Sequence, residues 1–446
     1  MQRPDIRRAV TAAAALTLSV AGCTAPGSDA VPTAATAGTA AAPSCGVSPV
    51  TLRARFETGF PLARALADEF TRQHPNVTWD IREEPFDVLT RNAPRVLADE
   101  PPDLMRLPQI SDVAGAGLLL GLDGYARRFG WAGRPPSQTR PLRVGNGGRP
   151  RGEGPLYATG LSTSVTGFFY NKELAARIGV REPGTLAELD DALARAARAG
   201  ITPLAGFNGG ATGGLTFPLQ SLMGAYGSTR AIDDWTFQRP GARIDTPPNT
   251  EAARHLARWL AAGYFDADLN ATDYARMVDR FASGRALFMV NGDWESAALD
   301  RRMPGRVGFF LTPPLTAGAP RAAMAGPPSF GIAARAAHPD CAAVFLDWAA
   351  SDRAARDLVV RVGGARPLGP VDPTLPVEPG SVTAATFAAT DEVLADDAAM
   401  DFIANATGSV YARSWTPRLQ QLVEGDLTPE GLLAGVQADY VAQTGG

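Results

Sequence analysis

The spacing of apolar residues changes twice between residues 50 and 81, and this change restricts the fold more than any other feature of the sequence. Apolar and polar residues alternate over residues 50–56, as in a strand with one buried face. Over residues 60–73 the apolar positions fall four apart, as on one side of a helix, and alternation returns over residues 77–81. A strand, a helix and a strand in this order predict a parallel βαβ unit and therefore an α/β fold.

Short apolar strands and amphipathic helices continue to alternate along the chain. Extended segments are expected at residues 104–107 and at residues 154–158, the latter paired with residues 165–170. Thr185, with Glu188 three residues further on, is expected to cap the helix that follows it. Further helices are predicted over residues 86–99, 111–119, 172–178, 186–199, 250–262, 274–283 and 340–349.

The first 22 residues have the composition of an export signal. Three Arg residues precede an apolar run, small residues follow, and the segment is too short to span a bilayer. Val20-Ala21-Gly22-Cys23 resembles the lipobox of bacterial lipoproteins, in which the Cys thiol is acylated and becomes the first residue of the mature chain. We therefore expect residues 1–22 to be a lipoprotein signal peptide and Cys23 to carry a lipid. The alternatives are an ordinary signal peptide cut nearby and a retained transmembrane helix.

The composition after Cys23 predicts a tether followed by a large folded part. Residues 23–48 are rich in Ala, Thr, Pro, Ser and Gly, with almost no large apolar side chains, so they predict a flexible segment. The remaining roughly 400 residues exceed what one core organises, so we expect two lobes with a cleft between them. Cys45 and Cys341 lie in a compartment that permits disulfides. They either pair and fix the tether to the first lobe, or stay free thiols, with Cys341 buried as a small apolar residue.

Charge and motif content exclude several classes of function. The formal net charge is −4 and there is no basic run, so the chain is a poor candidate for binding nucleic acid. It contains no Gly-x-Ser-x-Gly elbow, no His-Glu-x-x-His motif and no Gly-Lys-Ser/Thr phosphate loop, and its three His residues are scattered. We therefore expect a protein that is not an enzyme and that holds no metal ion and no cofactor.

Four segments occur in an order that one family of receptors shares. They are residues 56–77, which open with Phe-Glu-Thr-Gly, residues 102–123, the Gly-Phe-Phe-Tyr-Asn-Lys-Glu-Leu segment at 167–174, and residues 281–294, which end in Gly-Asp-Trp. Their order resembles family 1 extracellular solute-binding proteins, the maltose-binding-protein-like receptors of ABC importers. The resemblance implies a periplasmic-binding-protein-like fold, in which two α/β lobes are joined by crossing hinge strands and the ligand is trapped as the lobes close.

The resemblance also implies lobes that are discontinuous in sequence. The expected boundaries are residues 49–156 and 313–350 for the first lobe, and residues 157–312 and 351–446 for the second. The sequence departs from the family pattern at residues 134–155, which are crowded with Gly, Pro and Arg. This composition predicts a long surface loop that alters the rim of the cleft and thus the size of the ligand.

Trp294 is the leading candidate for a ligand contact. Sugars present hydroxyls, which need donors and acceptors, and apolar faces, which pack on aromatic rings. Trp294 follows a strand at a loop-to-helix junction, where the clefts of open α/β sheets lie, and the resemblance implies an aromatic residue here. The alternative is a Trp that caps the core. Asp293 beside it either accepts a sugar hydroxyl or caps the next helix. Glu57, directly after the first strand, is either a ligand contact or a solvated acid.

Other candidate contacts follow another strand and a loop. Gln109 and Asp112 come after the strand at residues 104–107 and are expected at the same cleft, unless Ser111 or Asp112 caps a helix instead. Ser162 and Thr163, in the loop before residue 165, either supply hydroxyls to the ligand or form an ordinary polar turn.

Trp235, Arg366 and Trp415 complete the set of candidate ligand-binding residues. Arg366 follows Gly363-Gly364-Ala365, a loop whose backbone has room for close approach to a ligand. Trp415 precedes a predicted helix.

These expectations together describe a receptor. We expect a monomer, lipid-anchored at the outer face of the cytoplasmic membrane, that binds a sugar or short oligosaccharide and delivers it to the permease of an ABC importer. The alternatives are a receptor for a polyol or sugar phosphate and a surface scaffold without a small ligand. A further alternative is a secreted glycosidase in which Glu57 and Asp293 act as acid and nucleophile.

Overall fold

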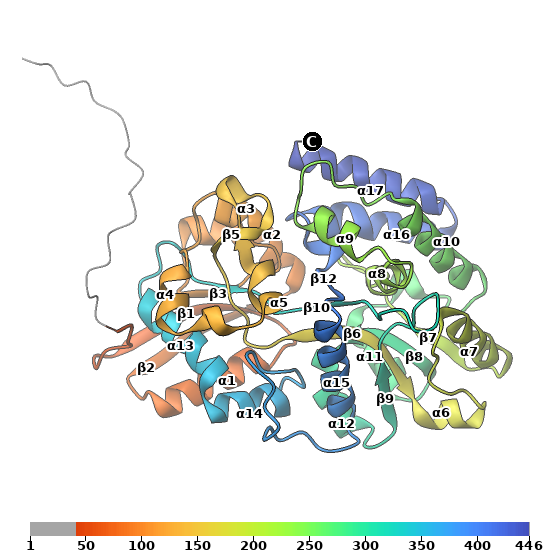
Figure 1. Cartoon of the computed structure of the whole chain (residues 1–446), viewed down its shortest axis with the longest axis horizontal. Helices are drawn as coiled ribbons and strands as arrows, with labels where there is room; N and C mark the ends of the chain where they lie inside the picture. Colours follow the sequence, from red (N-terminus) through yellow and green to blue (C-terminus); the bar gives the residue numbers. More distant parts are fainter. Residues whose placement is uncertain (1–41, 446) are drawn as a thin grey trace, which may run out of the picture. The chain divides into compact units, whose positions relative to one another are not determined.

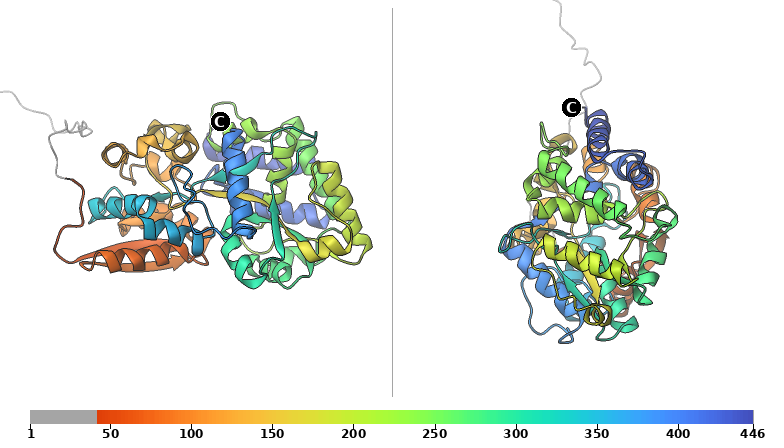
Figure 2. Two further views of the ribbon diagram at one scale, coloured as in Figure 1. Left: turned by 60° about the horizontal axis from the view of Figure 1, so that its bottom comes forward. Right: turned by 90° about the vertical axis from the view of Figure 1, so that its right-hand side faces the viewer.

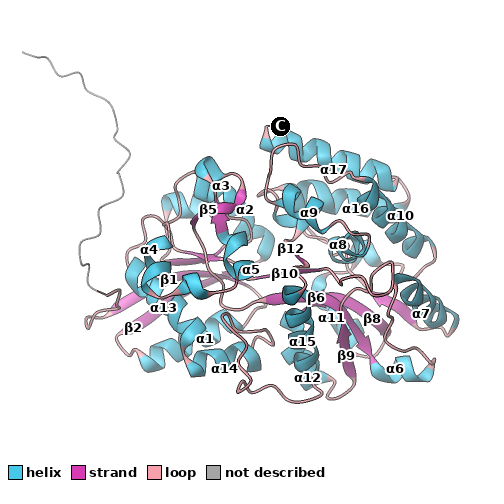
Figure 3. Ribbon diagram, viewed as in Figure 1, coloured by secondary structure: helices cyan, strands magenta, loops and turns pink. Residues whose placement is uncertain are grey.

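In the computed structural model, which describes residues 42–445, the chain folds into two α/β lobes, each built on its own sheet (Figure 1, Figure 3). The sheet of the first lobe has the strand order β11-β3-β1-β2. β1 runs parallel to β2 and to β3, and α1 connects β1 to β2, which confirms the predicted βαβ unit. Its strands are β1 (Val50–Glu57), β2 (Val77–Glu84), β3 (Leu104–Arg106) and β11 (Phe330–Gly331).

An aromatic cluster joins the helices of the first lobe to its sheet. Phe70 on α1 is fully buried and meets Trp79 on β2, as well as Phe345 and Trp348 on α13, with ring centroids 5.2–6.4 Å apart. Burying each such ring stabilises the fold by about 2 kcal/mol, so this cluster holds α13 against a strand far away in sequence. The main helices are α1 (Leu62–Gln73), α2 (Phe86–Asp99), α3 (Ser111–Gly115), α4 (Asp123–Arg128), α13 (Pro339–Ser351) and α14 (Arg353–Arg361).

The sheet of the second lobe is buried on both faces. All seven residues of β8 are buried, and β8 pairs antiparallel with β6. Side chains of a strand alternate between faces, so Phe168 and Phe169 on β6 join two different apolar clusters. The strands are β6 (Ser164–Asn171), β7 (Thr202–Ala205), β8 (Ala286–Gly292), β9 (Val307–Phe310), β10 (Ala323–Gly326) and β12 (Ala399–Met400).

Helices of the second lobe cover its sheet (Figure 2), and five of them, α6, α7, α11, α15 and α17, begin at a polar side chain that accepts a hydrogen bond from a first-turn amide. The Thr185 hydroxyl accepts a hydrogen bond from the Glu188 amide at 3.3 Å, so the predicted cap is confirmed. The helices are α6 (Lys172–Arg177), α7 (Leu186–Arg198), α8 (Thr216–Ala225), α9 (Thr229–Thr236), α10 (Pro247–Ala261), α11 (Tyr274–Ala282), α12 (Ser296–Arg302), α15 (Val382–Ala395), α16 (Thr416–Glu424) and α17 (Pro429–Thr444).

The chain passes between the lobes three times, and two of the passages differ from the expected boundaries. The expected passage at 313 is too early, because the β10 residues Ala323 and Ala325 still belong to the core of the second lobe. The expected passage at 351 is also too early, because α14 packs its Val359 into the core of the first lobe. Pro313-Pro314 follows the end of β9 and does not mark a change of lobe.

Residues 134–155 are not the predicted surface loop. Leu142 and Val144 are buried in the core of the first lobe, and β5 pairs with β4, whereas the prediction paired this strand with the following one. Gly and Pro here allow tight turns between short elements that still bury apolar side chains. The elements are α5 (Pro136–Thr139), β4 (Arg143–Val144), β5 (Arg151–Leu156) and the 3-10 turns Arg140–Leu142 and Asn146–Gly148.

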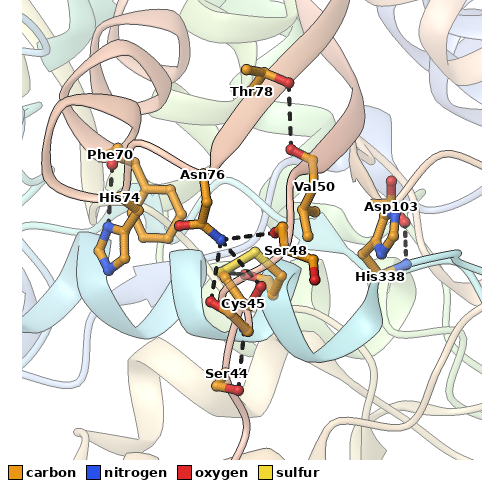
Figure 4. The surroundings of a disulfide bond; sticks show 12 residues. Ser44, Cys45, Ser48, Val50, Phe70, His74, Asn76, Thr78, Asp103 and His338 are labelled. Atoms are coloured by element: carbon orange, nitrogen blue, oxygen red, sulfur yellow. Dashed lines mark hydrogen bonds between the residues drawn. A yellow bond between two sulfur atoms is a disulfide. The ribbon is translucent and has the colours of Figure 1, made fainter.

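A disulfide fixes the start of the described chain to the first lobe (Figure 4). Cys45 is bonded to Cys341 on α13, with Cα atoms 4.4 Å apart, which decides between pairing and free thiols. The Asn76 side-chain amide donates hydrogen bonds to the backbone carbonyls of Cys45 and Ser48, at 3.4 and 3.2 Å. Residues 45–48 are therefore held in place, although the sequence assigned them to the tether.

The structure does not describe the residues to which the expectations for the amino end apply. The signal peptide at 1–22, the lipidation of Cys23 and the first part of the tether lie outside the described residues 42–445. Within residues 42–445, no helix has the length and apolar character needed to cross a bilayer.

Candidate ligand-binding site

A cavity of about 470 Å³ lies between the two lobes and is the candidate site. Both lobes and two of the connecting segments contribute to its wall, which is rich in aromatic side chains. The connecting residues are Leu161 and Ser162 in one segment and Pro327, Pro328 and Ser329 in the other. The aromatic lining residues are Phe60, Phe86, Phe207, Phe217, Tyr274, Trp294, Phe330, Phe402 and Tyr411.

Trp294 lies in the cavity wall, as the sequence predicted. It sits in the 3-10 turn Asp293–Glu295, between β8 and α12, and its side chain is half-buried. The indole Nε1 donates a hydrogen bond to the Tyr274 hydroxyl at 2.7 Å, and that hydroxyl donates to Glu295 at 2.6 Å. This chain of hydrogen bonds satisfies the polar edge of the indole and fixes its ring plane, leaving an apolar surface at the cavity.

The position of the Trp294 ring depends on the absence of a side chain at Gly292. A Cβ atom at residue 292 would lie 2.1 Å from Cζ3 of the indole, far inside any van der Waals contact. The ring therefore lies directly over the backbone of residue 292, which only a residue without a side chain permits.

Aromatic side chains of both lobes surround Trp294. Phe60, which follows β1 in the first lobe, meets Trp294 edge to face, with centroids 6.1 Å apart. Phe217 on α8 lies 6.2 Å away and stacks on Phe402 at 5.1 Å. Such a surface packs well on the C–H faces of a sugar ring or on another flat apolar group.

Glu57 and Arg106 form a buried ion pair in the wall of the first lobe. Arg106 Nε lies 3.5 Å from a carboxylate oxygen of Glu57, and both side chains are at most 15% exposed. Burial raises the pKa of Glu57 above its ordinary value and lowers the pKa of Arg106, and the attraction between the two charges opposes both shifts. The pair offers an acceptor and a donor in an otherwise apolar wall. Glu57 therefore lies in the cavity wall, and the alternative interpretation of Glu57 as a solvated acid is wrong.

Of the two predicted hydroxyl contacts, Ser162 and Thr163, only one lies at the cavity. Ser162 lines the cavity. Thr163 is fully buried outside the lining, where its amide donates to the Arg366 carbonyl at 2.7 Å. Because neighbouring residues of an extended segment point in opposite directions, only one of the two hydroxyls can face the ligand space.

Gln109 and Asp112 do not line the cavity. Gln109 is buried, and its side-chain oxygen accepts a hydrogen bond from the Asp112 backbone at 3.4 Å. Gln109 therefore caps α3, whereas neither Ser111 nor Asp112 makes the capping bond that the sequence suggested. The Asp112 side chain is exposed.

Asp293 is a buried acid outside the cavity lining. Its side chain is 1% exposed, and neither carboxylate oxygen has a hydrogen bond of normal geometry within the described residues. Burial raises the pKa of Asp293 well above its ordinary value, and the nearby Ser164 hydroxyl and Val165 amide only partly oppose that shift. Asp293 thus neither contacts the ligand space nor caps α12.

Trp235, Trp415 and Arg366 are structural residues, contrary to expectation. Trp235 and Trp415 are fully buried in the core of the second lobe and meet each other at 6.0 Å. Arg366 is 5% exposed and forms an ion pair of 2.9 Å with Asp391 on α15. None of the three lines the cavity.

Sequence reasoning missed several residues of the wall. Arg106 ends β3 next to β1, so its position at a strand's carboxyl end was a usable signal. Phe60 directly follows the Thr-Gly turn after β1, which was another. Tyr274 and Asp401 gave no such signal, because each comes from an element whose place depends on long-range packing.

A second hollow lies on the surface of the second lobe. It has a volume of about 480 Å³ and is lined by small residues with Arg321, Glu392 and Asp396. It offers no aromatic surface, so the cavity between the lobes is the better candidate for a ligand site.

Comparison with known proteins identifies the family and the solved structures that share this fold. Residues 57–356 match the family model described as bacterial extracellular solute-binding protein. The chain belongs to this family. None of the curated proteins compared with the chain matches it. Among solved structures, a chitin oligosaccharide binding protein superimposes with a TM-score of 0.75 at 20% identity, covering 89% of this chain and 100% of that one.

Two further structures share the fold. The GacH receptor of Streptomyces glaucescens GLA.O, solved unliganded and with acarbose, gives a TM-score of 0.70 at 20% identity, covering 89% of this chain and 99% of that one. Maltose-bound T. maritima MalE3 gives 0.69 at 18% identity, covering 87% and 98%. The resemblance inferred from the four sequence segments is confirmed, and the cavity of this solute-binding protein lies between its two lobes, where a closing pair of lobes would enclose a ligand.

Proposed function

We propose that this solute-binding protein captures a sugar or a short oligosaccharide in the cavity between its lobes. The observation that carries the proposal is the fixed indole of Trp294, which presents an apolar face in the same cavity as the Glu57–Arg106 pair. A ring for C–H faces and charged partners for hydroxyls are the two needs of a sugar. The printed names of similar structures mention chitin oligosaccharide, acarbose, maltose and raffinose, which supports the same class.

The charge balance of the wall supports a neutral ligand over a sugar phosphate. Arg106 is paired with Glu57, and the other arginine of the lining, Arg151, is paired with Asp401 at 2.5 Å. A phosphate would need arginines that are not already neutralised, or a free helix amino end. A polyol remains compatible with the same donors and acceptors and is the second candidate ligand.

The setting of the receptor follows from the amino-terminal sequence. We propose that residues 1–22 direct export, that a lipid on Cys23 anchors the protein at the outer face of the cytoplasmic membrane, and that the ligand-bound monomer is recognised by an ABC importer permease. Mass spectrometry of the protein from membranes tests the anchor, since acylated Cys23 should be the first residue of the mature chain.

The geometry favours binding over glycoside hydrolysis. A glycosidase needs two carboxyl groups on either side of the scissile bond. Glu57 lines the cavity, whereas Asp293 is buried outside it. The pair suggested by the sequence is therefore not assembled, and we propose that the protein is a receptor and not an enzyme.

A thermal-shift screen tests the proposed function. The protein is melted with sugars, polyols, sugar phosphates and amino acids at millimolar concentration, because a ligand that binds only the folded state raises the melting temperature. We expect a rise with one class of carbohydrate and none with amino acids. A rise with sugar phosphates alone would contradict the neutral-ligand argument, and a rise with amino acids alone would contradict the sugar assignment.

A further inference from the structure

Residues 134–155, called here the clasp segment, are rooted in the first lobe. Leu142 and Val144 are part of the core of that lobe. A Cβ at Gly148 would lie 2.8 Å from the Ser111 carbonyl oxygen, so the backbone of the segment packs directly on α3. The segment is thus packed onto the first lobe at several points along its length.

The far side of the clasp segment contacts the second lobe. The Arg151 amide donates a hydrogen bond of 2.9 Å to the carbonyl of Phe237, which follows α9. Glu153 lies 4.0 Å from Arg239, and the Arg149 guanidinium donates to the carbonyl of Thr444 at the end of α17. These contacts connect the lobes in addition to the three passages of the covalent chain.

Four charged side chains form the centre of this connection. Arg140 and Arg151 come from the clasp segment, and Asp233 and Asp401 come from the second lobe. Arg140 lies 3.2 Å from Asp233, and Arg151 lies 2.5 Å from Asp401. The two acids are tied together, because Asp233 accepts a hydrogen bond of 2.9 Å from the Asp401 amide. Arg151 and Asp401 are only 5% and 12% exposed, so their attraction is weakly screened by solvent.

The ring of Phe237 completes the contact. The guanidinium groups of Arg140 and Arg151 lie 5.6 and 5.1 Å from its centroid, so one aromatic residue of the second lobe faces two cations of the clasp segment. The clasp segment therefore contacts the second lobe through two ion pairs and through two cations that face one aromatic ring.

The same residues form part of the cavity wall. Pro141, Leu142 and Arg151 of the clasp segment line the cavity, together with Asp401 opposite them. The Nε and Nη1 atoms of Arg151 are buried and have no hydrogen-bond partner among the described residues. The buried guanidinium therefore depends on its ion pair with Asp401 for compensation of its charge.

We propose that the clasp segment joins the lobes at one end of the cavity and closes that end, so that Arg151 and Asp401 limit the length of the ligand. The passages of the chain act as hinges in a two-lobed receptor, and a non-covalent connection elsewhere restricts their opening. The cavity volume of about 470 Å³ lies in the lower half of the usual range for small-molecule sites, and we expect one or two sugar rings to fill it. The limit on length rests on the proposed function, whereas the connection between the lobes does not.

The distance between the lobes tests the connection without any ligand. Spin labels are placed on the full chain carrying Cys23→Ser, at the exposed residues Arg95 on α2 and Ala197 on α7, through Arg95→Cys and Ala197→Cys. Pulsed electron resonance should give one narrow distance distribution. Adding Arg151→Met should broaden it and move it to longer distances, and the isosteric Asp401→Asn should do so if Arg151→Met fails to fold.

The matched control removes an ion pair inside one lobe. Arg418 lies 2.6 Å from Asp439, and both residues belong to the second lobe, so Arg418→Met should leave the distance distribution unchanged. An unchanged distribution in both Arg151→Met and Asp401→Asn would overturn the connection between the lobes.

Oligosaccharide ladders test the limit on length. Maltose-series and chitin-series oligosaccharides of one to six rings are titrated calorimetrically against the wild type and Asp401→Asn. We expect wild-type affinity to fall at least about tenfold beyond the short members, and this fall to disappear in Asp401→Asn because the end of the cavity opens. Equal wild-type affinity for short and long members would overturn the limit. If no ladder binds, the sugar assignment fails, and the distance measurement still decides whether the clasp exists.

Discussion

Phe60 and Trp294 meet edge to face across the cavity, with ring centroids 6.1 Å apart and an angle of 68° between the rings. Phe60 belongs to the first lobe and Trp294 to the second. Each lobe therefore contributes one aromatic ring to this part of the cavity wall. A ligand that packs on Trp294 would therefore be covered by Phe60 as the lobes close. Contacts that form only in the closed state are those that shift the equilibrium toward it.

Replacing Phe60 should weaken binding without unfolding the protein. Phe60→Ala removes the ring that covers the ligand from the first lobe, and we expect about a tenfold loss of affinity for the sugar found in the screen. Titration calorimetry measures the loss. Phe129→Ala is the control, since Phe129 is a half-buried ring of the first lobe that stacks near Trp131, away from the cavity lining. Equal effects of the two changes would argue against a specific role for Phe60.

Filling the space beneath the indole should displace it. Gly292→Ala places a methyl group 2.1 Å from the Trp294 ring, so the ring must leave its position and its hydrogen bond to Tyr274. We expect a loss of affinity of tenfold or more and a decrease of about 1–3 kcal/mol in the free energy of unfolding. Gly124→Ala on α4, where the new Cβ meets no atom within 4 Å, should leave the affinity unchanged and should not lower the free energy of unfolding. Normal sugar affinity in Gly292→Ala would show that the ring position is unimportant.

The disulfide should stabilise the first lobe without affecting ligand binding. Cys45 and Cys341 are 296 residues apart, and closing so long a loop restricts the unfolded chain strongly. Reduction, or the double change Cys45→Ser and Cys341→Ala, should lower the free energy of unfolding by about 2–4 kcal/mol. Affinity at 25 °C should be unchanged, because neither residue lines the cavity. Two titratable thiols at residues 45 and 341 in the unreduced protein would contradict the bond.

Asp233 should make stability depend on pH in a direction unusual for an acid. Burial raises its pKa from 3.8 to about 6 and the Asp401 charge adds to that shift, while a hydrogen bond from the Asp401 amide and the charges of Arg140 and Arg151 oppose it. The folded state therefore holds this proton more tightly than the unfolded chain, so its contribution to stability is present below pH 4 and is lost as the pH rises to about 6.

The pH dependence is measured against a variant. Denaturant titrations at pH 4 and pH 6 should show the wild type losing about 1–3 kcal/mol relative to Asp233→Asn over this interval. Asp234→Asn, in which the replaced carboxyl is 36% exposed, should follow the wild type. Parallel curves for the wild type and Asp233→Asn would rule out a raised pKa at this residue.

Local patterns predicted the parts of the fold that local forces determine. The βαβ unit follows from the change of period between residues 50 and 81, and the Thr185 cap from side chains within one turn of the helix. Trp294 and Glu57 lie at the cavity because both follow strands, and strand ends of an α/β lobe face the cleft. Their contact with a ligand stays a prediction.

Long-range packing decided the features that the sequence could not predict. Trp235 is a large aromatic residue like Trp294, but it stacks at 4.6 Å on Tyr440, about two hundred residues later, and is thereby buried. Arg366 looked free in its Gly-rich loop until Asp391 on α15 was placed beside it. The composition of residues 134–155 suggested a loop, because the few apolar residues that anchor it are separated by turn residues.

The most direct test of the account is a calorimetric titration of the wild type and Trp294→Ala with the sugar identified in the screen. Trp294 supplies the apolar face of the cavity in the proposed function, and removing a stacked indole at a binding site costs about 2 kcal/mol or more. We predict at least about a thirtyfold loss of affinity in Trp294→Ala, with circular dichroism and Cys45–Cys341 pairing unchanged. Wild-type affinity in a folded Trp294→Ala would contradict the claim that sugars bind in the cavity between the lobes.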